Sequence, residues 1–352
     1  MKNVALVLTL ILPLALSSIG SPLQKEQVAA DAKWVVHLDV DKLRSTAVGD
    51  YIINHVLDAK LGSLTRQFDF DLDWKKVHSL TAFGTGYQSK SSFNGVLLIN
   101  TELDLQKVLD ATIEKASQEK DNKSAPIQKT QEGDVTTYSL KDHMFVSFGP
   151  GRPVIAGKSL DSIQKAGEVL SGTGANLAST KTFSEFPKAQ EPFFFLGTVE
   201  AFMPNSELAE GSHEGDTLNP KAKILKLADG GQVVLGEDSN QLFLDLSLKA
   251  KSADVVTQMQ QVIQGMIALA SLSQLDNQDL QQLAQSAKVS SAGNIVTLKL
   301  GYPADQAVLL LSSNLNKHLE HKKRAENSED QGTRHRSKNK STQNEPAKTD
   351  EQ

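Results

Sequence analysis

Histidine and aspartate residues near the start of the chain have side chains that can bind metal ions or exchange protons. His37, Asp39 and Asp41 alternate along the segment WVVHLDVDKL, and His78 opens a later apolar segment. If these two segments pair in one sheet, the four side chains converge into a metal or acid–base cluster. This pattern predicts a metal-dependent hydrolase. The alternative is structural, because a strand histidine can bond within its sheet and Asp39 or Asp41 can cap the helix that follows.

A second acidic stretch, FDFDLDW at residues 68–74, places three aspartates at alternate positions. A calcium loop of the EF-hand type needs glycine at its sixth position and a bidentate glutamate at its twelfth. Counted from Asp69, these positions hold Trp74 and Leu80. The alternation of acidic and apolar residues is typical of a pleated segment with one apolar face. We therefore expect these aspartates to face solvent.

Glycine-rich segments and the absence of cysteine limit the remaining chemistry. GTGYQSKSS at residues 84–92 has Ser89 where a phosphate-binding loop needs its second glycine, and a strand pattern follows where a helix must begin. GPGRPVIAG at residues 149–157 could bind an anion through backbone amides with help from Arg152, or it could form a tight turn. The chain has no cysteine, which excludes thiol catalysis and thiolate metal sites. The sequence predicts no catalytic residue and no cofactor.

A long amphipathic segment at residues 253–272 suggests a different kind of site. Met259, Ile263 and Met266 lie on its wide apolar face, opposite several glutamines. Flexible methionines can line a groove for an apolar ligand between such a helix and a sheet. A helix that only covers a sheet needs the same apolar stripe. The sequence therefore leaves a carrier of an apolar ligand and a plain core helix as alternatives.

The two ends of the chain differ in composition from its body. Residues 1–20 carry Lys2, a short apolar run and then small residues, with SIG (18–20) or ALS (15–17) before plausible cleavage sites. This layout is typical of a secretory signal peptide, and the run is too short for a comfortable membrane span. We expect export to the periplasm or the extracellular space, with no transmembrane span after cleavage. Residues 317–352 are polar with mixed charges, which predicts a disordered tail.

The body between these ends predicts two similar α+β units, at residues 31–178 and 190–315. In each unit a short strand precedes a hairpin, an amphipathic helix and a further hairpin. Hairpins that follow one another argue against a parallel, doubly wound sheet. We expect each unit to be an antiparallel sheet with helices on one face.

Three segments of the body carry a family resemblance: WVVHLDVDKLRSTAVGDYI, DLDWKKVHSLTAFGTG and NGVLLINTELDLQKVLDA. Together with the signal-like N-terminus, they resemble a group of exported, uncharacterised bacterial proteins known mostly from planctomycete and verrucomicrobial genomes. The resemblance covers nearly the whole body, and its motifs are strand ends, caps and turn glycines. It implies the fold and export, while the group has no established activity to carry over. The polar tail departs from the pattern.

Charge and composition complete the functional expectation. The net charge of −5 gives no general attraction for nucleic acid. We expect a non-enzymatic protein of the bacterial envelope that binds or scaffolds an unknown envelope protein, polymer or lipid. The apolar-ligand carrier is the first alternative, and the metal-dependent hydrolase is the second.

Overall fold

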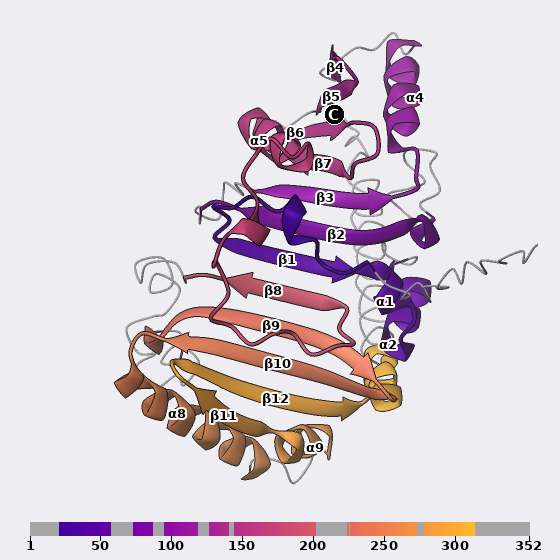
Figure 1. Cartoon of the computed structure of the whole chain (residues 1–352). Coiled ribbons are helices and arrows are strands. Elements are labelled where there is room, and N and C mark those ends of the chain that lie inside the picture. The colour runs from indigo at the N-terminus through magenta and orange to yellow at the C-terminus, as the bar shows by residue number, and fades with distance from the viewer. Residues whose placement is uncertain are drawn as a thin grey trace, which may run out of the picture.

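One antiparallel sheet of 12 strands organises the described part of the chain (Figure 1). The computed structural model describes residues 21–57, 73–86, 95–118, 127–140, 144–201, 224, 226–272 and 278–313. The expected signal segment, residues 68–72 of the acidic stretch and the expected polar tail lie outside these residues. All strand pairs are antiparallel, so the α+β class is confirmed and a doubly wound sheet is excluded.

The strands follow the chain from a short first strand to the long strands of the second half. They are β1 (Trp34–Asp39), β2 (Val77–Gly84), β3 (Val96–Thr101), β4 (Gln128–Glu132), β5 (Val135–Leu140), β6 (Met144–Phe148), β7 (Val154–Gly157), β8 (Phe195–Val199), β9 (Ala228–Asp238), β10 (Gln241–Ala250), β11 (Lys288–Ala292) and β12 (Ile295–Pro303). Their order across the sheet is β11-β12-β10-β9-β8-β1-β2-β3-β7-β6-β5-β4.

Helices connect the strands and cover the sheet. They are α1 (Val40–Arg44), α2 (Ala47–Tyr51), α4 (Leu105–Gln118), α5 (Leu160–Leu170), α8 (Ala253–Leu272) and α9 (Gln278–Ser286), with a π-helical turn η2 (Ile52–Leu57) and the 3-10 turns η1 (Lys25–Gln27), η3 (Trp74–Lys76) and η5 (Leu177–Ser179). Residues 304–313 are also helical. Polar side chains cap several starts: the carboxylate of Asp39 accepts the backbone N–H of Lys42 at α1, and Ser159 caps α5.

The two predicted units contribute the two halves of this single sheet. Outward from the centre, the first half runs β1-β2-β3-β7-β6 and the second runs β8-β9-β10-β12-β11, in matching chain order. The first half then adds the hairpin of β5 and β4 at its edge. The central pair joins the halves, with Trp34 opposite Val199 and Leu38 opposite Phe195. The core of the protein is therefore continuous through the β1–β8 pair.

Tight turns set the register of the hairpins. Gly133 and Gly293 have φ of 57° and 55°, and each is the first of two residues that link a strand pair. Glycine reaches positive φ without a steric cost, as such turns require. Ser239 and Asn240 link β9 to β10, and both also have positive φ. The hairpins predicted in the second half, β9–β10 and β11–β12, are confirmed, whereas the β4–β5 hairpin at Gly133 was not predicted.

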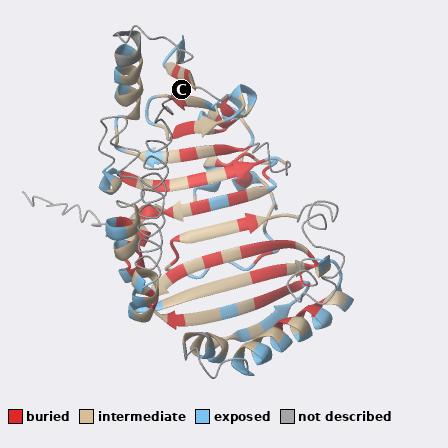
Figure 2. Cartoon of the chain, turned by 180° about the vertical axis from the view of Figure 1, so that it is seen from behind, coloured by how far each residue is buried: buried red, intermediate tan, exposed pale blue. Residues whose placement is uncertain are grey.

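Helices lie on both faces of the sheet because the strands are apolar on both sides. Leu98 of β3 packs with α5 and the segment around η1, whereas the neighbouring Ile99 packs with α4 on the opposite face. Helix α8 lies on the same face as α4, since Ile99 and Leu246 point to the same side in the register of the sheet. Our expectation placed all helices of a unit on one face, whereas in the first half the structure has α5 opposite α4. The burial pattern along the strands is visible from behind in Figure 2.

Candidate ligand-binding site

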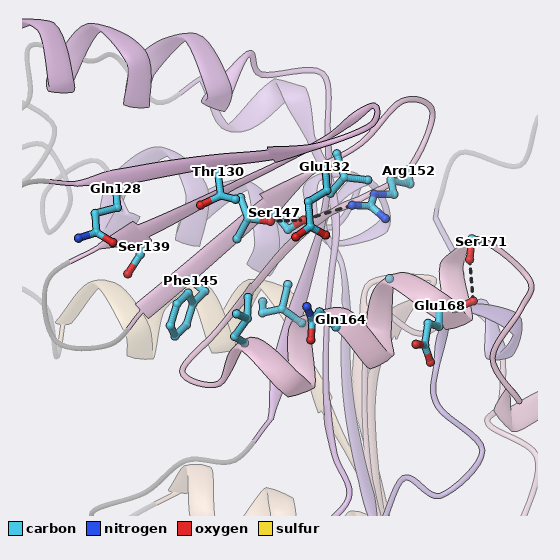
Figure 3. Close-up of a pocket in the computed structure, with 15 residues that line it drawn as sticks. Gln128, Thr130, Glu132, Ser139, Phe145, Ser147, Arg152, Gln164, Glu168 and Ser171 are labelled. Carbon is cyan, nitrogen blue, oxygen red and sulfur yellow. Dashed lines mark hydrogen bonds between the residues drawn. The ribbon is translucent and has the colours of Figure 1, made fainter.

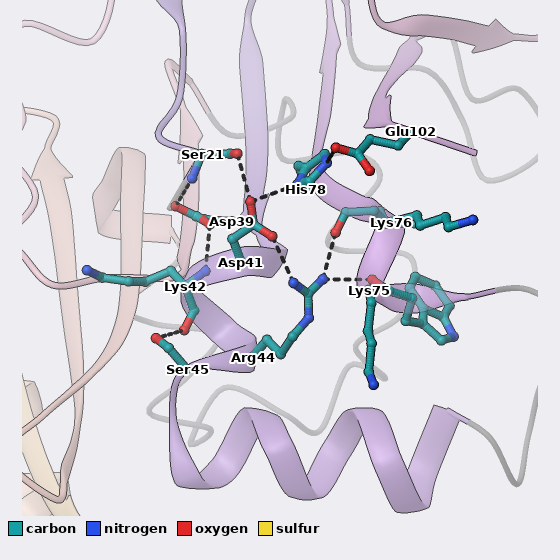
Figure 4. Close-up of polar contacts among 12 residues, drawn as sticks. Ser21, Asp39, Asp41, Lys42, Arg44, Ser45, Lys75, Lys76, His78 and Glu102 are labelled. Atoms are coloured by element: carbon teal, nitrogen blue, oxygen red, sulfur yellow. Dashed lines mark hydrogen bonds and ion pairs between the residues drawn. The ribbon is translucent and has the colours of Figure 1, made fainter. Parts of the chain in front are cut away.

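The four residues predicted to form a metal or acid–base cluster do lie near one another, at one end of β1 and β2. His78 Nδ1 lies 2.9 Å from Asp41 Oδ2, while Asp41 Oδ1 accepts a hydrogen bond from Arg44 at 2.9 Å (Figure 4). The side chains of His37 and Asp39 follow one another on a single face of β1. Adjacent pairing of β1 and β2 brings the two segments together, as the hypothesis assumed.

Each member of this group already has a structural partner. His37 is 1% exposed, and its ring nitrogens contact the Thr81 hydroxyl at 2.9 Å and the Ser21 carbonyl at 3.0 Å. Burial lowers the pKa of His37, which favours the neutral ring. Asp39 is committed to the cap of α1. The described residues contain no group of three or more His, Cys, Asp or Glu side chains that could hold a metal ion.

Arg44 explains why this corner of the fold is polar. Its guanidinium donates to Asp41 and to the backbone carbonyls of Trp74 and Val77, at 2.7 and 3.0 Å (Figure 4). These bonds fasten α1 to the start of β2. Charge-assisted bonds of this kind are stronger than neutral ones. The cluster therefore joins elements, and the hydrolase hypothesis gains no set of metal ligands from it.

The apolar residues proposed for a ligand groove lie in the core beneath α8. Met259 is 0% exposed and Ile263 is 3% exposed, and Met266 packs against the same cluster with Leu248 and Val296. The helix occupies the predicted residues 253–272. Of the helices the structure describes, none is long and apolar enough to cross a membrane. In this position the three side chains fill the space between helix and sheet.

A hollow of about 710 Å³ lies at the other end of the sheet, between its outer strands and α5 (Figure 3). Its volume falls in the range of small-molecule sites. Hydroxyl and amide groups dominate the strand side, and α5 supplies apolar and polar groups below. The lining residues are Gln128, Thr130, Glu132, Val135, Thr137, Ser139, Phe145, Ser147, Arg152, Leu160, Ile163, Gln164, Gly167, Glu168 and Ser171.

Arg152 gives this hollow its distinctive chemistry. Its Nη2 donates to the Ser147 hydroxyl at 3.2 Å, while Nε is buried without any hydrogen-bond partner. Within the described chain, no carboxylate lies within ion-pair distance of the guanidinium, although Glu132 and Glu168 line the same hollow. Burial lowers the pKa of Arg152, a sign that the charge is partly removed from water. A partly desolvated cation without a counter-ion is suited to an anionic group.

Glycines around the turn between β6 and β7 make room for this arginine. A Cβ at position 149 would collide with the Arg152 side chain, and one at position 167 of α5 would lie 3.4 Å from Nη1. Gly151 has a φ of 64°, which favours glycine in the turn. The segment GPGRPVIAG thus forms the tight turn that the sequence allowed. It also places Arg152 beside the hollow.

The hydroxyl residues of the strands were missed by sequence reasoning. Thr130, Thr137 and Ser147 stand side by side on β4, β5 and β6, because these residues are direct partners in the sheet register. These three residues lie next to one another because of the strand order β7-β6-β5-β4, which local sequence patterns do not predict. Arg152 was the one signal available, as a cation in a glycine-rich turn.

Comparison with known proteins gives distant matches only. No protein-family model matches the chain, and no curated protein does. Matching solved structures include crystal form III of TP0453, with 12% identity and a TM-score of 0.46, covering 83% of this chain and 99% of that chain. Crystal form I of TP0453 matches with 12% identity and a TM-score of 0.44, covering 83% and 98%. The similarity is low in both sequence and structure.

Proposed function

We propose that the protein is an exported binding protein of the bacterial envelope, and that it takes a small, hydroxylated anion in the hollow beside α5. The observation that carries this proposal is Arg152, a partly buried cation without a carboxylate partner at a hollow lined with hydroxyl groups. Its guanidinium would pair with the ligand's carboxylate or phosphate group. Thr130, Thr137 and Ser139 would bond the ligand's hydroxyls.

The composition of the lining supports a ligand that has both polar groups and an apolar face. Val135, Phe145, Leu160 and Ile163 offer an apolar surface on which the ring of a sugar acid could rest. Glu132 and Glu168 line the same hollow and would disfavour ligands with several negative charges, because their carboxylates repel further negative charge. The proposal is therefore specific to ligands with one acidic group. The signal-like residues 1–20 support the envelope location.

Thermal shift and calorimetric titration can test this proposal with matched ligands. Glucuronate and galacturonate each carry a single carboxylate, and glucose is the neutral control. We expect the acidic sugars to raise the melting midpoint and glucose to have no effect, because only the former can pair with the guanidinium. Arg152→Gln should abolish the shift. Lys165→Gln, on the solvent side of α5, should preserve it because Lys165 pairs with Asp161 on the surface.

Two outcomes would contradict the proposal. The first is equal stabilisation by glucose and glucuronate, which would show that charge is not recognised. The second is an acid-specific shift that Arg152→Gln preserves, which would place the anion site elsewhere. If no sugar acid binds, titration with acetate and inorganic phosphate at millimolar concentration isolates the charge itself, and no Arg152-dependent response would refute an anion site.

A further inference from the structure

Ser21, the first residue that the structure describes, is held by all of its backbone and side-chain polar groups. Its backbone nitrogen donates to Asp39 Oδ2 at 2.7 Å, and its hydroxyl donates to Asp41 Oδ2 at 3.2 Å (Figure 4). Its carbonyl oxygen contacts His37 Nε2 at 3.0 Å. A residue so near the end of a domain is rarely ordered unless it is tied down in this way.

The carboxylate of Asp39 lacks a cation. Asp39 is 4% exposed, and its two oxygens accept only the backbone N–H groups of Lys42 and Ser21. Among the described residues, no lysine or arginine lies within ion-pair distance of the Asp39 carboxylate. The nearby Arg44 pairs with Asp41 instead. Burial lowers the pKa of the neighbouring His37, which disfavours a positive charge on its ring. Two backbone N–H groups satisfy this carboxylate, and a positive charge at Ser21 would add an ion pair to one of these bonds.

We infer that a peptidase hydrolyses the peptide bond between residues 20 and 21, and that the new α-ammonium of Ser21 is the counter-ion of Asp39. Water supplies the hydroxyl of the released carboxyl group and a hydrogen for the nitrogen of Ser21. The new amine takes one further proton from solvent at neutral pH. Its three N–H groups replace the single N–H of a peptide nitrogen, and one already has an acceptor at 2.7 Å.

The sequence before Ser21 fits this reaction. The triplet SIG at 18–20 has small residues one and three positions before the bond, as secretory signal peptidases require. The competing triplet ALS would leave a chain that begins at Ser18, in which Ser21 keeps a neutral peptide nitrogen. Only cleavage after residue 20 creates the charge that Asp39 lacks. The group of side chains predicted to bind a metal would then bind the N-terminus of the processed chain.

Comparing the two processing products tests the inference. Chains that begin at Ser21 or at Ser18 can each be released from an N-terminal fusion, with and without Asp39→Asn. We expect the Ser21 chain to melt about 1–2 °C above the Ser18 chain, the shift expected for roughly 1 kcal/mol in a chain of more than 300 residues. Asp39→Asn should remove that difference, because the ammonium then has no carboxylate partner.

N-terminal sequencing of the exported protein provides an independent measurement that needs no variant. We expect the sequence SPLQKEQ, starting at Ser21. A mature chain that starts at Ser18, or one that retains Met1, would overturn the inference. Equal melting midpoints for the Ser21 and Ser18 chains would also overturn it, even if cleavage occurs after residue 20. If Asp39→Asn fails to fold, the comparison of the two wild-type products and the sequencing result still decide the question.

Discussion

At the scale of single residues, the buried His37 and the partly buried Arg152 have different roles. Both ring nitrogens of His37 have hydrogen-bond partners, one in the sheet and one in the N-terminal segment, and burial lowers its pKa, which favours the neutral ring. Arg152 has one bond to Ser147 and a buried nitrogen that is left without a partner. An unsatisfied buried donor costs stability. We therefore place the binding chemistry at Arg152 and a structural role at His37.

His37 predicts a loss of stability in mild acid. Burial lowers its pKa below the ordinary value of 6.5, so the unfolded chain binds the proton more readily than the folded one. The stabilisation is complete above pH 6.5 and is lost as the pH falls from 6.5 to the lowered value. The slope cannot exceed about 1.4 kcal/mol per pH unit from one group. Urea unfolding between pH 5 and 7.5 should show a shallower dependence for His37→Gln than for the exposed His55→Gln. Equal slopes for the two variants would contradict this assignment.

Two buried tyrosines, one in each half of the sheet, should each lose a similar amount of stability when changed to phenylalanine. Tyr138 donates to Asp110 of α4 at 2.8 Å, and Tyr302 donates to Asp279 of α9 at 2.6 Å. Burial raises the pKa of Tyr302 to about 12, helped by the bond to Asp279. Each Tyr→Phe change should cost about 0.5–1.5 kcal/mol, since it removes one hydrogen bond and leaves the ring in place. Denaturant titration of the double variant should give the sum of the two losses, because the sites share no partner. A loss in the double variant far from that sum would show that the two bonds are coupled.

At the scale of elements, the sequence predicted those helices and hairpins that depend on interactions between residues close together in the chain. The hairpin of β9 and β10 and the helix at 253–272 follow from apolar periodicity and turn residues. Strand β4 was missed because its sequence QKTQE is exposed throughout and has no apolar face. Only backbone pairing with β5 makes it a strand. The hollow needs β4 and α5 together, so it could not be read from either segment.

Helix α8 allows a direct test of the apolar-carrier alternative. Met259 is 0% exposed in the core, whereas Leu269 on the same helix is 62% exposed. Met259→Ala should cost about 2–5 kcal/mol, as expected for a cavity in a packed core. Leu269→Ala should change the free energy of unfolding by less than about 0.5 kcal/mol. Chemical denaturation measures both, and native mass spectrometry shows any retained lipid. A stable Met259→Ala protein that loses a bound lipid would support the carrier instead.

At the scale of the whole molecule, the pairing of β1 with β8 joins the two halves into one sheet. Without it, each half would expose the edge of a central strand, and open edges favour aggregation. Sequence analysis identified two similar units but not their fusion, because the contact joins residues that are far apart in the chain. The corner around Asp39 lies beside the centre of the sheet, and the hollow lies toward its outer edge.

A single continuous sheet predicts that both halves unfold together. Trp34 and Trp74 are the two tryptophans, and both lie in the first half. Trp34 pairs with Val199 of β8, so their fluorescence reports on the first half and on its junction with the second. Circular dichroism in the far ultraviolet follows the whole sheet. We expect both signals to give one common midpoint, because breaking β1 from β8 would expose the core on both sides. The Met259→Ala change in α8 should lower the fluorescence midpoint as much as the dichroism midpoint, although its site is in the other half. A fluorescence midpoint that stays at the wild-type value while the dichroism curve splits in two would show that the halves are separate folding units.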